Sequence, residues 1–228
     1  MAYFLRKQED ILGSRSFFME HFDIGVVGWW YGENYGSMLT YYALHHTLKS
    51  MGYSVLMIHD ALGYPEGRIK WNDTMAPMTF AKQHYKYYDQ VNYTELGQLN
   101  NLCDTFICGS DQLWNPLIKR VNSDYFLDFT FDEKKRISYG TSFGNKSSMK
   151  NADKFIEKNK KNICRFDAVS VREDYAVDMA REYYGIKSVN VVDPVFLPDI
   201  AVYEELAENA KEKTEGDYLL AFILDPTI

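Results

Sequence analysis

The sequence predicts an α/β protein built on a Rossmann-like, doubly wound parallel sheet. Short apolar runs alternate along the chain with segments whose apolar residues recur at helical spacing, and parallel strands need helical crossovers of this kind. Two of the apolar runs lead directly into glycine-containing turns with polar side chains, which is how open parallel sheets present binding sites. The length of 228 residues suits either one domain or one domain and a fraction of another.

The predicted strands are short apolar runs bounded by polar or turn residues. They fall at 23–28, 53–59, 104–108, 136–141, 168–172, 188–192 and 218–224. The predicted helices have apolar residues three and four positions apart, and they fall near 37–51, 94–101, 150–163, 174–184 and 200–212. Ser37 is expected to cap the first helix and Gly52 to end it. Residues 60–78 contain glycine and proline without clear periodicity, so we expect a long loop over the rim of the site.

The domain organisation follows from this order of elements. Residues 1–22 are interpreted as an amino-terminal extension, 23–212 as the Rossmann-like domain, and 213–228 as a linker with the first strand of a second domain. That last strand, within Tyr218–Pro226, would expose an apolar edge if it had no partner. We therefore expect the chain to be a piece of a longer, two-domain protein.

The composition argues against several classes of protein. A formal charge of −7 disfavours nucleic acid as the main partner, because affinity for the phosphate backbone comes largely from clustered lysine and arginine. Cys103, Cys108 and Cys164 have neither metal-ligand spacing nor the density of a disulfide scaffold, which favours a reducing, cytoplasmic setting. No signal peptide is recognisable, and no apolar run approaches the roughly 20 residues of a membrane-spanning helix. The sequence has no zinc spacing, Walker loop or Ser-His-Asp order, so no cofactor is predicted.

The most informative segment is 106–116, an apolar strand that runs into a turn crowded with polar and aromatic side chains. Gly109 is expected to let the chain turn where a residue with a Cβ would be strained. The candidate site residues that follow it are Ser110, Asp111, Gln112, Trp114 and Asn115. Because ligands bind outside the carboxyl ends of parallel strands, this position favours a binding site.

A second segment, 23–37, has the same form. An apolar strand is followed by a glycine-spaced turn and then at once by the first helix. Asn34, Gly36 and Ser37 therefore lie at a helix amino end, where free N–H groups and the helix dipole favour a phosphate or carboxylate. The alternative for these three residues is a turn and helix cap without a ligand.

Six short sequence motifs occur in a defined order along the chain. They are Asn34–Ser37, Gly109–Pro116, Tyr125–Phe129, Ile137–Gly144, Ser170–Glu173 and Val192–Pro194. In these segments the sequence resembles the polysaccharide pyruvyl transferases, and the run from Gly109 to Asn115 is the most specific part. The resemblance spans Ile24 to about Pro226.

The resemblance implies a two-domain enzyme of glycosyltransferase-B-like architecture, of which this chain is the amino-terminal half. Such enzymes move a pyruvyl group from phosphoenolpyruvate to a free or glycolipid-linked sugar in the assembly of bacterial cell-surface polysaccharide. The implied setting is the cytoplasm, with attachment to the inner membrane face and homo-oligomer formation left open. Since the family's further basic and histidine residues lie in the second domain, the chain by itself is expected not to turn over.

Asp111 is the candidate catalytic residue, because its carboxylate can accept hydrogen bonds from two neighbouring acceptor hydroxyls, with Gln112 and Asn115 beside it. Its alternative role is to cap its own turn through backbone N–H groups. Trp114 is a candidate for stacking on a sugar face. A tryptophan before proline more often anchors its loop on the core, and packing is the favoured interpretation.

Arg172 ends a predicted strand and is a candidate for binding the anionic donor, since a guanidinium matches the geometry of phosphate and carboxylate. The alternative is a structural ion pair with Glu173 or Asp174. Ser142 is expected either to add a hydroxyl to the same crevice or to act as a local cap.

The sequence is also compatible with two other functions. A nucleotide-sugar-dependent glycosyltransferase has the same two-domain architecture and a similar glycine turn. A non-catalytic sugar- or phosphate-binding module would keep the first domain without the half that completes the cleft. Stabilisation of the chain by phosphoenolpyruvate, by a nucleotide-sugar or by neither separates the three functions.

Overall fold

The computed structural model describes residues 20–30, 34–58, 76–88, 93–119, 121–210, 216, 217 and 219. The chain divides into two compact units, Met1–Leu197 and Pro198–Ile228. The first unit contains the sheet. In the second unit the described part contains α6 (Ile200–Glu208), whose N-cap Asp199 accepts a hydrogen bond from Ala201 N at 3.0 Å.

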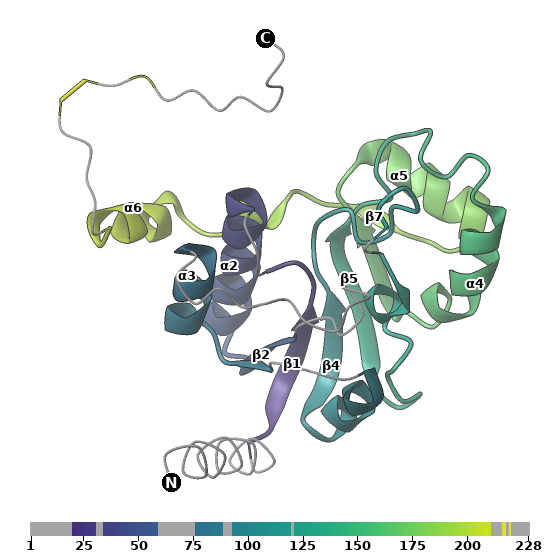
Figure 1. The fold of residues 1–228 in the computed structure, drawn as a ribbon, viewed down its shortest axis with the longest axis horizontal. Helices are drawn as coiled ribbons and strands as arrows, with labels where there is room; N and C mark the ends of the chain where they lie inside the picture. The colour runs from purple at the N-terminus through teal and green to yellow at the C-terminus, as the bar shows by residue number, and fades with distance from the viewer. Residues whose placement is uncertain are drawn as a thin grey trace, which may run out of the picture. The chain divides into compact units, whose positions relative to one another are not determined.

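The described part of the first unit is built around one sheet of seven strands, all paired in parallel (Figure 1). The strands are β1 (Phe22–Val27), β2 (Val55–Ile58), β3 (Tyr87–Tyr88), β4 (Cys103–Cys108), β5 (Lys135–Thr141), β6 (Ala168–Val171) and β7 (Val189–Asn190). Their spatial order is β3-β2-β1-β4-β5-β6-β7. The chain thus winds one way from β1 and the other way from β4, which confirms the predicted Rossmann-like, doubly wound fold class.

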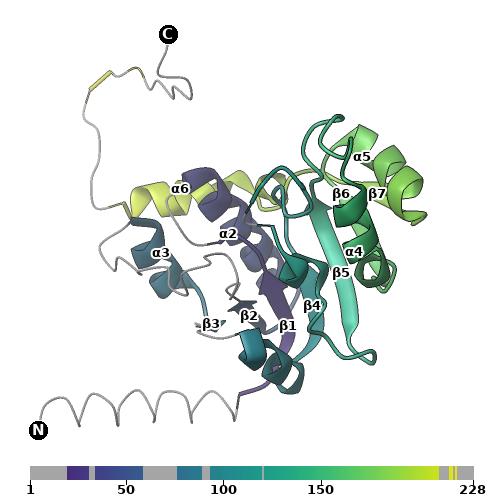
Figure 2. The ribbon, with the colours of Figure 1, turned by 45° about the vertical axis from the view of Figure 1, so that its right-hand side comes forward.

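Helices cover both faces of the sheet. They are α2 (Tyr35–Ser50), α3 (Ala76–His84), η1 (Tyr93–Asn101), η2 (Ser123–Phe126), α4 (Asp153–Ile163), α5 (Asp174–Met179), η3 (Ala180–Tyr184) and η4 (Pro194–Phe196). The helices α2 and α3 lie on one side of the sheet, and α4 and α5 lie on the other (Figures 1 and 2). None of the helices in the described stretches has the length and apolar character needed to span a bilayer.

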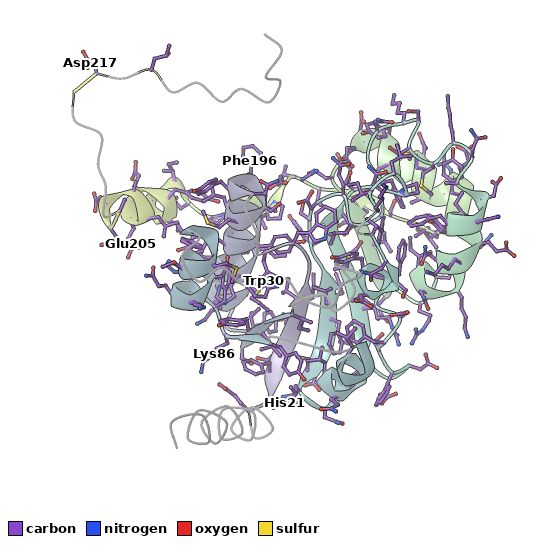
Figure 3. The ribbon with its side chains drawn as sticks, in the orientation of Figure 1. His21, Trp30, Lys86, Phe196, Glu205 and Asp217 are labelled. Atoms are coloured by element: carbon purple, nitrogen blue, oxygen red, sulfur yellow. The ribbon has the colours of Figure 1, made fainter. Side chains whose placement is uncertain are left out.

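Side chains of the central strands point alternately into two cores. Ile24 of β1 and Ile107 of β4 pack with α2 and α3, whereas Val27 and Phe106 pack in the core on the opposite face. Burial on both faces explains why these strands are nearly continuous apolar runs in the sequence. Trp30, just beyond β1, is fully buried in the core beside α2 and α3 (Figure 3).

Four described elements, α3, β3, η2 and η4, are absent from the sequence-based prediction. The end of the predicted loop 60–78 is helical, because Ala76 begins α3. Pro77 indicated a loop in the sequence, yet proline is well tolerated in the first turn of a helix. The strand β3 is only two residues long, which leaves no periodicity to detect.

Other predicted segments lie mostly outside the described residues. This holds for residues 60–75 of the predicted loop, for 1–19 of the predicted extension, and for the predicted strand 218–224, of which Leu219 alone is described.

The strands β1 and β4 are neighbours, and they pair in register from Phe22 opposite Cys103 to Val27 opposite Cys108. Their crossovers leave in opposite directions, since β2 lies beyond β1 and β5 lies beyond β4. This divergence creates the crevice in which doubly wound sheets bind ligands. Both predicted site segments follow these two strands directly.

Tyr41 of α2 packs closely against the ends of both strands. Its hydroxyl donates to the Ser110 carbonyl at 2.7 Å. A Cβ on Gly28 would lie 1.7 Å from the Tyr41 hydroxyl oxygen, and a Cβ on Gly109 would lie 2.4 Å from Cε1 of the same ring. Neither glycine has a positive φ. Gly109 is therefore required by the close approach of Tyr41 and not by the turn, which corrects the reason predicted from the sequence.

Gly28→Ala is expected to destabilise the fold by roughly 1–3 kcal/mol, the usual cost of forcing an extra group into a packed site. Gly97→Ala is the matched control, because a Cβ at Gly97 meets no atom within 4 Å. Urea denaturation measures both variants. Equal stability of the two would contradict the packing of Tyr41 against Gly28.

His45 is a buried polar residue on the face of α2 that packs toward α3. It is 6% exposed, and its ring centroid lies 4.9 Å from that of Tyr85. Burial, with smaller effects from the charges of Lys49, His46 and His84, lowers the pKa of His45 from 6.5 to about 4. The neutral imidazole is therefore the form that suits the folded protein.

Acidification is expected to weaken the fold through His45. Between pH 6.5 and about 4 the unfolded chain binds a proton at His45 that the folded chain does not bind. The stability present above pH 6.5 is therefore lost as the pH falls toward 4, by about 3 kcal/mol in total. Denaturant titrations across this range are expected to show a flatter pH dependence for His45→Gln than for the unsubstituted protein, with a smaller change for His46→Gln, which removes only a minor contribution to the His45 pKa. Equal pH dependence in His45→Gln and the unsubstituted protein would contradict this assignment.

Candidate functional site

A cleft of about 470 Å³ opens at the carboxyl edge of the sheet. Its residues come from four stretches of chain, which follow β1, β4, β6 and β7 and meet because parallel strands end at one edge. The lining residues are Asn34, Gly36, Ser37, Leu39, Thr40, Asp111, Arg172, Asp193, Val195 and Phe196. Five of the predicted site residues are thus brought together, and Phe196, 75% exposed, lies at the amino end of α2 (Figure 3).

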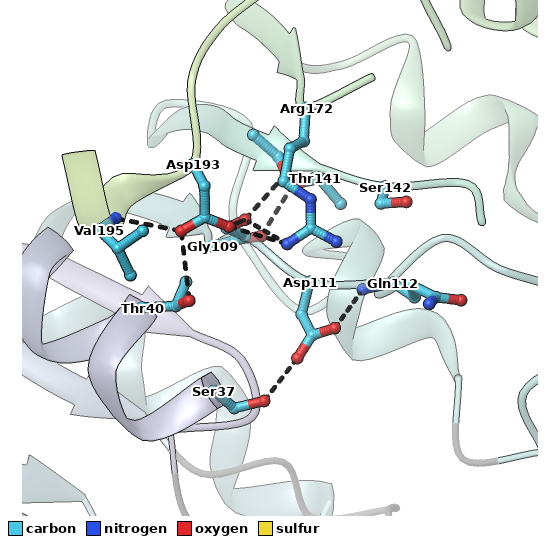
Figure 4. Close-up of polar contacts among 12 residues, drawn as sticks. Ser37, Thr40, Gly109, Asp111, Gln112, Thr141, Ser142, Arg172, Asp193 and Val195 are labelled. Carbon is cyan, nitrogen blue, oxygen red and sulfur yellow. Dashed lines mark hydrogen bonds and ion pairs between the residues drawn. The ribbon is translucent and has the colours of Figure 1, made fainter. Parts of the chain in front are cut away.

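Asp111 presents its carboxylate toward α2 (Figure 4). Its Oδ2 accepts a hydrogen bond from the Ser37 hydroxyl at 2.7 Å, and its Oδ1 accepts one from Gln112 N at 2.8 Å. One oxygen therefore caps the turn, as the alternative role predicted. The same side chain also lines the cleft, so the two roles proposed for it are compatible.

The backbone of Asp111 has a φ of 120°, in a region that favours glycine. Backbone contacts with the end of β5 hold this conformation. The Asp111 carbonyl accepts a hydrogen bond from Ser142 N at 2.9 Å, and Asp111 pairs with Thr141 in an isolated β-bridge. Strain of this kind costs roughly 1–3 kcal/mol and clusters at functional sites.

Asn34, and not Ser37, is the N-cap of α2. Asn34 Oδ1 accepts from Ser37 N at 3.2 Å, and the helix begins at Tyr35. The predicted cap is wrong by three residues, because an asparagine side chain caps a helix as well as a serine does. The Ser37 hydroxyl is consequently free to reach Asp111. A carboxylate at the first turn of a helix is stabilised by the helix dipole, so Asp111 supplies negative charge where the sequence predicts an anionic ligand.

Arg172 reaches into the cleft from the end of β6 (Figure 4). Its Nη1 donates to Asp193 Oδ2 at 2.9 Å, and its Nε lies 3.5 Å from Glu173 Oε1. Burial by itself lowers the pKa of Arg172, but the hydrogen bond to Asp193 and the charges of Glu173, Asp193 and Asp111 outweigh burial and raise that pKa. The ion pairs of the described residues join Arg172 to Glu173, one of its two predicted partners, and not to Asp174. The guanidinium is a permanent cation in the wall of the cleft.

Asp193 is a lining residue that the sequence-based prediction omitted. It follows the predicted strand 188–192 just as Asp111 follows 104–108, and it belongs to the family-like segment Val192–Pro194. The sequence signal that could have identified Asp193 is its position as a polar residue directly after a predicted parallel strand.

Three predicted site residues lie behind the cleft. Trp114 is fully buried and its Nε1 donates to the Tyr125 carbonyl at 2.9 Å, so it anchors the loop on the core and cannot stack on a sugar in this arrangement. Ser142 is fully buried and accepts from Gly144 N at 3.0 Å, as a local cap does. Ser110 is also fully buried, and its Oγ lies 3.4 Å from Arg172 Nη1.

Asn115 and Gln112 form the turn after β4 and do not line the cleft. Asn115 Nδ2 donates to Gln112 Oε1 at 2.7 Å, and Asn115 Oδ1 accepts from Leu117 N at 2.9 Å. Asn115 is nearly buried, so these bonds satisfy a side chain that water does not reach. The two residues support the loop that carries Asp111.

The described part of the site is acidic. Three carboxylates, Asp111, Glu173 and Asp193, surround the single positive charge of Arg172. Carboxylates accept hydrogen bonds from hydroxyl groups, which suits a polyhydroxylated ligand, whereas a phosphate would depend on Arg172. Within the described stretches, no group of three or more His, Cys, Asp and Glu side chains is placed to hold a metal ion.

The chain belongs to the polysaccharide pyruvyl transferase family, because the model of that family matches residues 34–226. The match includes all the residues that line the cleft, and it confirms the resemblance seen in the sequence. No curated protein matches the chain. Membership identifies a transferase and implies a sugar or polysaccharide acceptor.

The strain at Asp111 can be measured with two variants. Asp111→Gly and Asp111→Ala remove the same carboxylate and differ only in backbone freedom. At an ordinary helical position glycine is less stable than alanine by roughly 0.5–1 kcal/mol. At a φ of 120° we expect the opposite sign, with the glycine variant more stable by about 1 kcal/mol.

Glu157 provides the control pair for this comparison, because it is exposed on the helix α4. Glu157→Gly is expected to be less stable than Glu157→Ala in the same urea denaturation experiment. If the glycine variant is also the less stable one at Asp111, the backbone there is not strained.

Proposed function

We propose that the protein takes part in the transfer of a pyruvyl group from phosphoenolpyruvate to two hydroxyls of a sugar. The observation that carries the proposal is that Asp111 and Arg172 line one cleft, while the ion pairs of the described residues do not join them to each other. The reaction needs a cation for the donor and a hydrogen-bond acceptor for the sugar. A direct pair between the two side chains would neutralise both.

The proposed reaction forms a ketal on the sugar and releases phosphate. The enol double bond of phosphoenolpyruvate takes a proton at its methylene carbon, which becomes a methyl group and leaves a cationic carbon. One sugar hydroxyl adds to that carbon, phosphate departs with the electron pair of its C–O bond, and the second hydroxyl adds. Of the two hydroxyl protons released, one balances the proton taken up by the methylene and the other leaves with phosphate.

Arg172 is proposed to bind the phosphate or carboxylate of the donor, because a guanidinium presents paired N–H groups to planar anions. Asp111 is proposed to accept hydrogen bonds from the acceptor hydroxyls and to take a proton from one of them. The Ser37 hydroxyl orients Asp111 through its 2.7 Å hydrogen bond, and Asn34 and Gly36 form the adjoining edge of the cleft.

We propose a cytoplasmic enzyme of cell-surface polysaccharide assembly, with a free or lipid-linked sugar as acceptor. The group that protonates the methylene is assigned to a second domain of glycosyltransferase-B-like architecture, outside the residues that line this cleft. Binding of the donor, and not turnover, is therefore the appropriate first readout.

Phosphoenolpyruvate is expected to raise the melting temperature of the chain, since a ligand at about 100 times its dissociation constant stabilises by roughly 2.7 kcal/mol. Arg172→Gln is expected to remove most of that shift. Arg181→Gln is the matched control, because it removes an exposed arginine that pairs only with Asp178 among the described residues, and it is expected to keep the shift. Thermal denaturation with and without ligand measures all three proteins.

The same experiment with a nucleotide-sugar separates the alternatives. A shift with the nucleotide-sugar and none with phosphoenolpyruvate would support a glycosyltransferase. No shift with either ligand would contradict donor binding at this cleft and favour a non-catalytic module.

A further inference from the structure

The Asp193 carboxylate binds groups from four segments of the fold (Figure 4). Its Oδ2 accepts from Arg172 Nη1 at 2.9 Å and lies 3.3 Å from Ser110 Oγ. Its Oδ1 accepts from the Thr40 hydroxyl at 3.3 Å and from Val195 N at 3.0 Å. With both oxygens bound, the carboxylate has a single orientation.

Asp193 therefore determines where the guanidinium of Arg172 lies. Nη1 faces Asp193 and Ser110, and Nε faces Glu173. Among the described residues no hydrogen bond uses Nη2, so one edge of the guanidinium is left for a ligand. Asp111 is near enough to act on the charge of Arg172, yet the two are not joined by an ion pair.

We propose that Asp193 is a positioning residue that holds Arg172 away from Asp111, so that Arg172 stays available to an anionic ligand and Asp111 to a hydroxyl ligand. This inference rests on the proposed function for the identity of those ligands. It does not require Asp193 to touch either ligand.

The physical reason is competition between neighbouring carboxylates for one cation. Arg172 is partly buried, and a partly buried cation is held by whichever carboxylate offers the best geometry. Asp193 offers a 2.9 Å hydrogen bond, whereas Glu173 lies at 3.5 Å. Loss of the Asp193 charge removes the stronger partner, and Asp111 then captures the guanidinium.

The test is a cycle of variants with phosphoenolpyruvate binding as the readout, measured by calorimetry. Asp193→Asn, which preserves shape and removes charge, is expected to weaken binding about tenfold, the usual effect of losing a charge-assisted hydrogen bond. Glu173→Gln removes a charge at a similar place without removing the short bond, and its effect is expected to be smaller. Equal losses of phosphoenolpyruvate affinity in the two variants would show that only the net charge near Arg172 matters, and this would overturn the positioning role.

The double variant Asp193→Asn/Asp111→Asn is the decisive member of the cycle. If Asp111 captures Arg172 once Asp193 is neutralised, removing the Asp111 charge is expected to restore most of the lost binding. The same Asp111→Asn change in the unsubstituted protein is expected to alter binding less. A double variant that binds as weakly as Asp193→Asn would overturn the proposal, because a general loss of structure is not repaired by a second substitution.

A second measurement needs no ligand. The side-chain ¹⁵Nε resonance of Arg172, assigned by its loss in Arg172→Lys, is expected to report an ordered side chain that becomes mobile or shifts in Asp193→Asn. An unchanged resonance would overturn the positioning role. If the unsubstituted protein fails to bind phosphoenolpyruvate while the resonance changes as expected, the donor assignment fails and the role of Asp193 stands.

Discussion

The contact that the site depends on most is the close packing of Tyr41 against the ends of β1 and β4. The ring fits only because Gly28 and Gly109 have no side chain, and its hydroxyl bonds the carbonyl of Ser110. One helical turn earlier, at the same face of α2, Ser37 meets Asp111. The distance between helix and sheet is therefore set by two glycines, and that distance brings a hydroxyl on the helix to a carboxylate on the loop.

A second constraint is the balance of charge in the cleft. Three carboxylates and one guanidinium gather at an edge where several side chains are mostly buried, and burying a charge is costly unless it is paired. Separate hydrogen bonds compensate the burial of these charges. Asp193 pairs with Arg172, and the Asp111 carboxylate accepts hydrogen bonds from the Ser37 hydroxyl and from Gln112 N. The residue with the strained backbone, Asp111, is also the one whose carboxylate accepts the hydrogen bond from Ser37 of α2.

Much of the fold could be predicted from the sequence, since strands buried on both faces appear as apolar runs and their crossovers have helical periodicity. The elements that were not predicted are α3, β3, η2 and η4, none longer than nine residues. Tertiary packing stabilises such elements more than local preference does. Within the site, Asp111, Arg172 and Ser37 were found because they follow strands or begin a helix. Trp114 and Ser142 were predicted for the same reason, yet both are buried. The position of a residue after a strand does not determine whether its side chain points toward the cleft or toward the core.

The sequence by itself determined the class of sheet, the family, and the edge at which polar residues collect, because periodicity, turn chemistry and short motifs are properties of neighbouring residues. Only the tertiary structure decided which of those residues share a cleft. Thr40 and Asp193 are 153 positions apart, and Ser37 and Asp111 are 74 apart. Such pairs form because strand order and register bring distant turns to one edge of the sheet, and order and register depend on the packing of the whole domain.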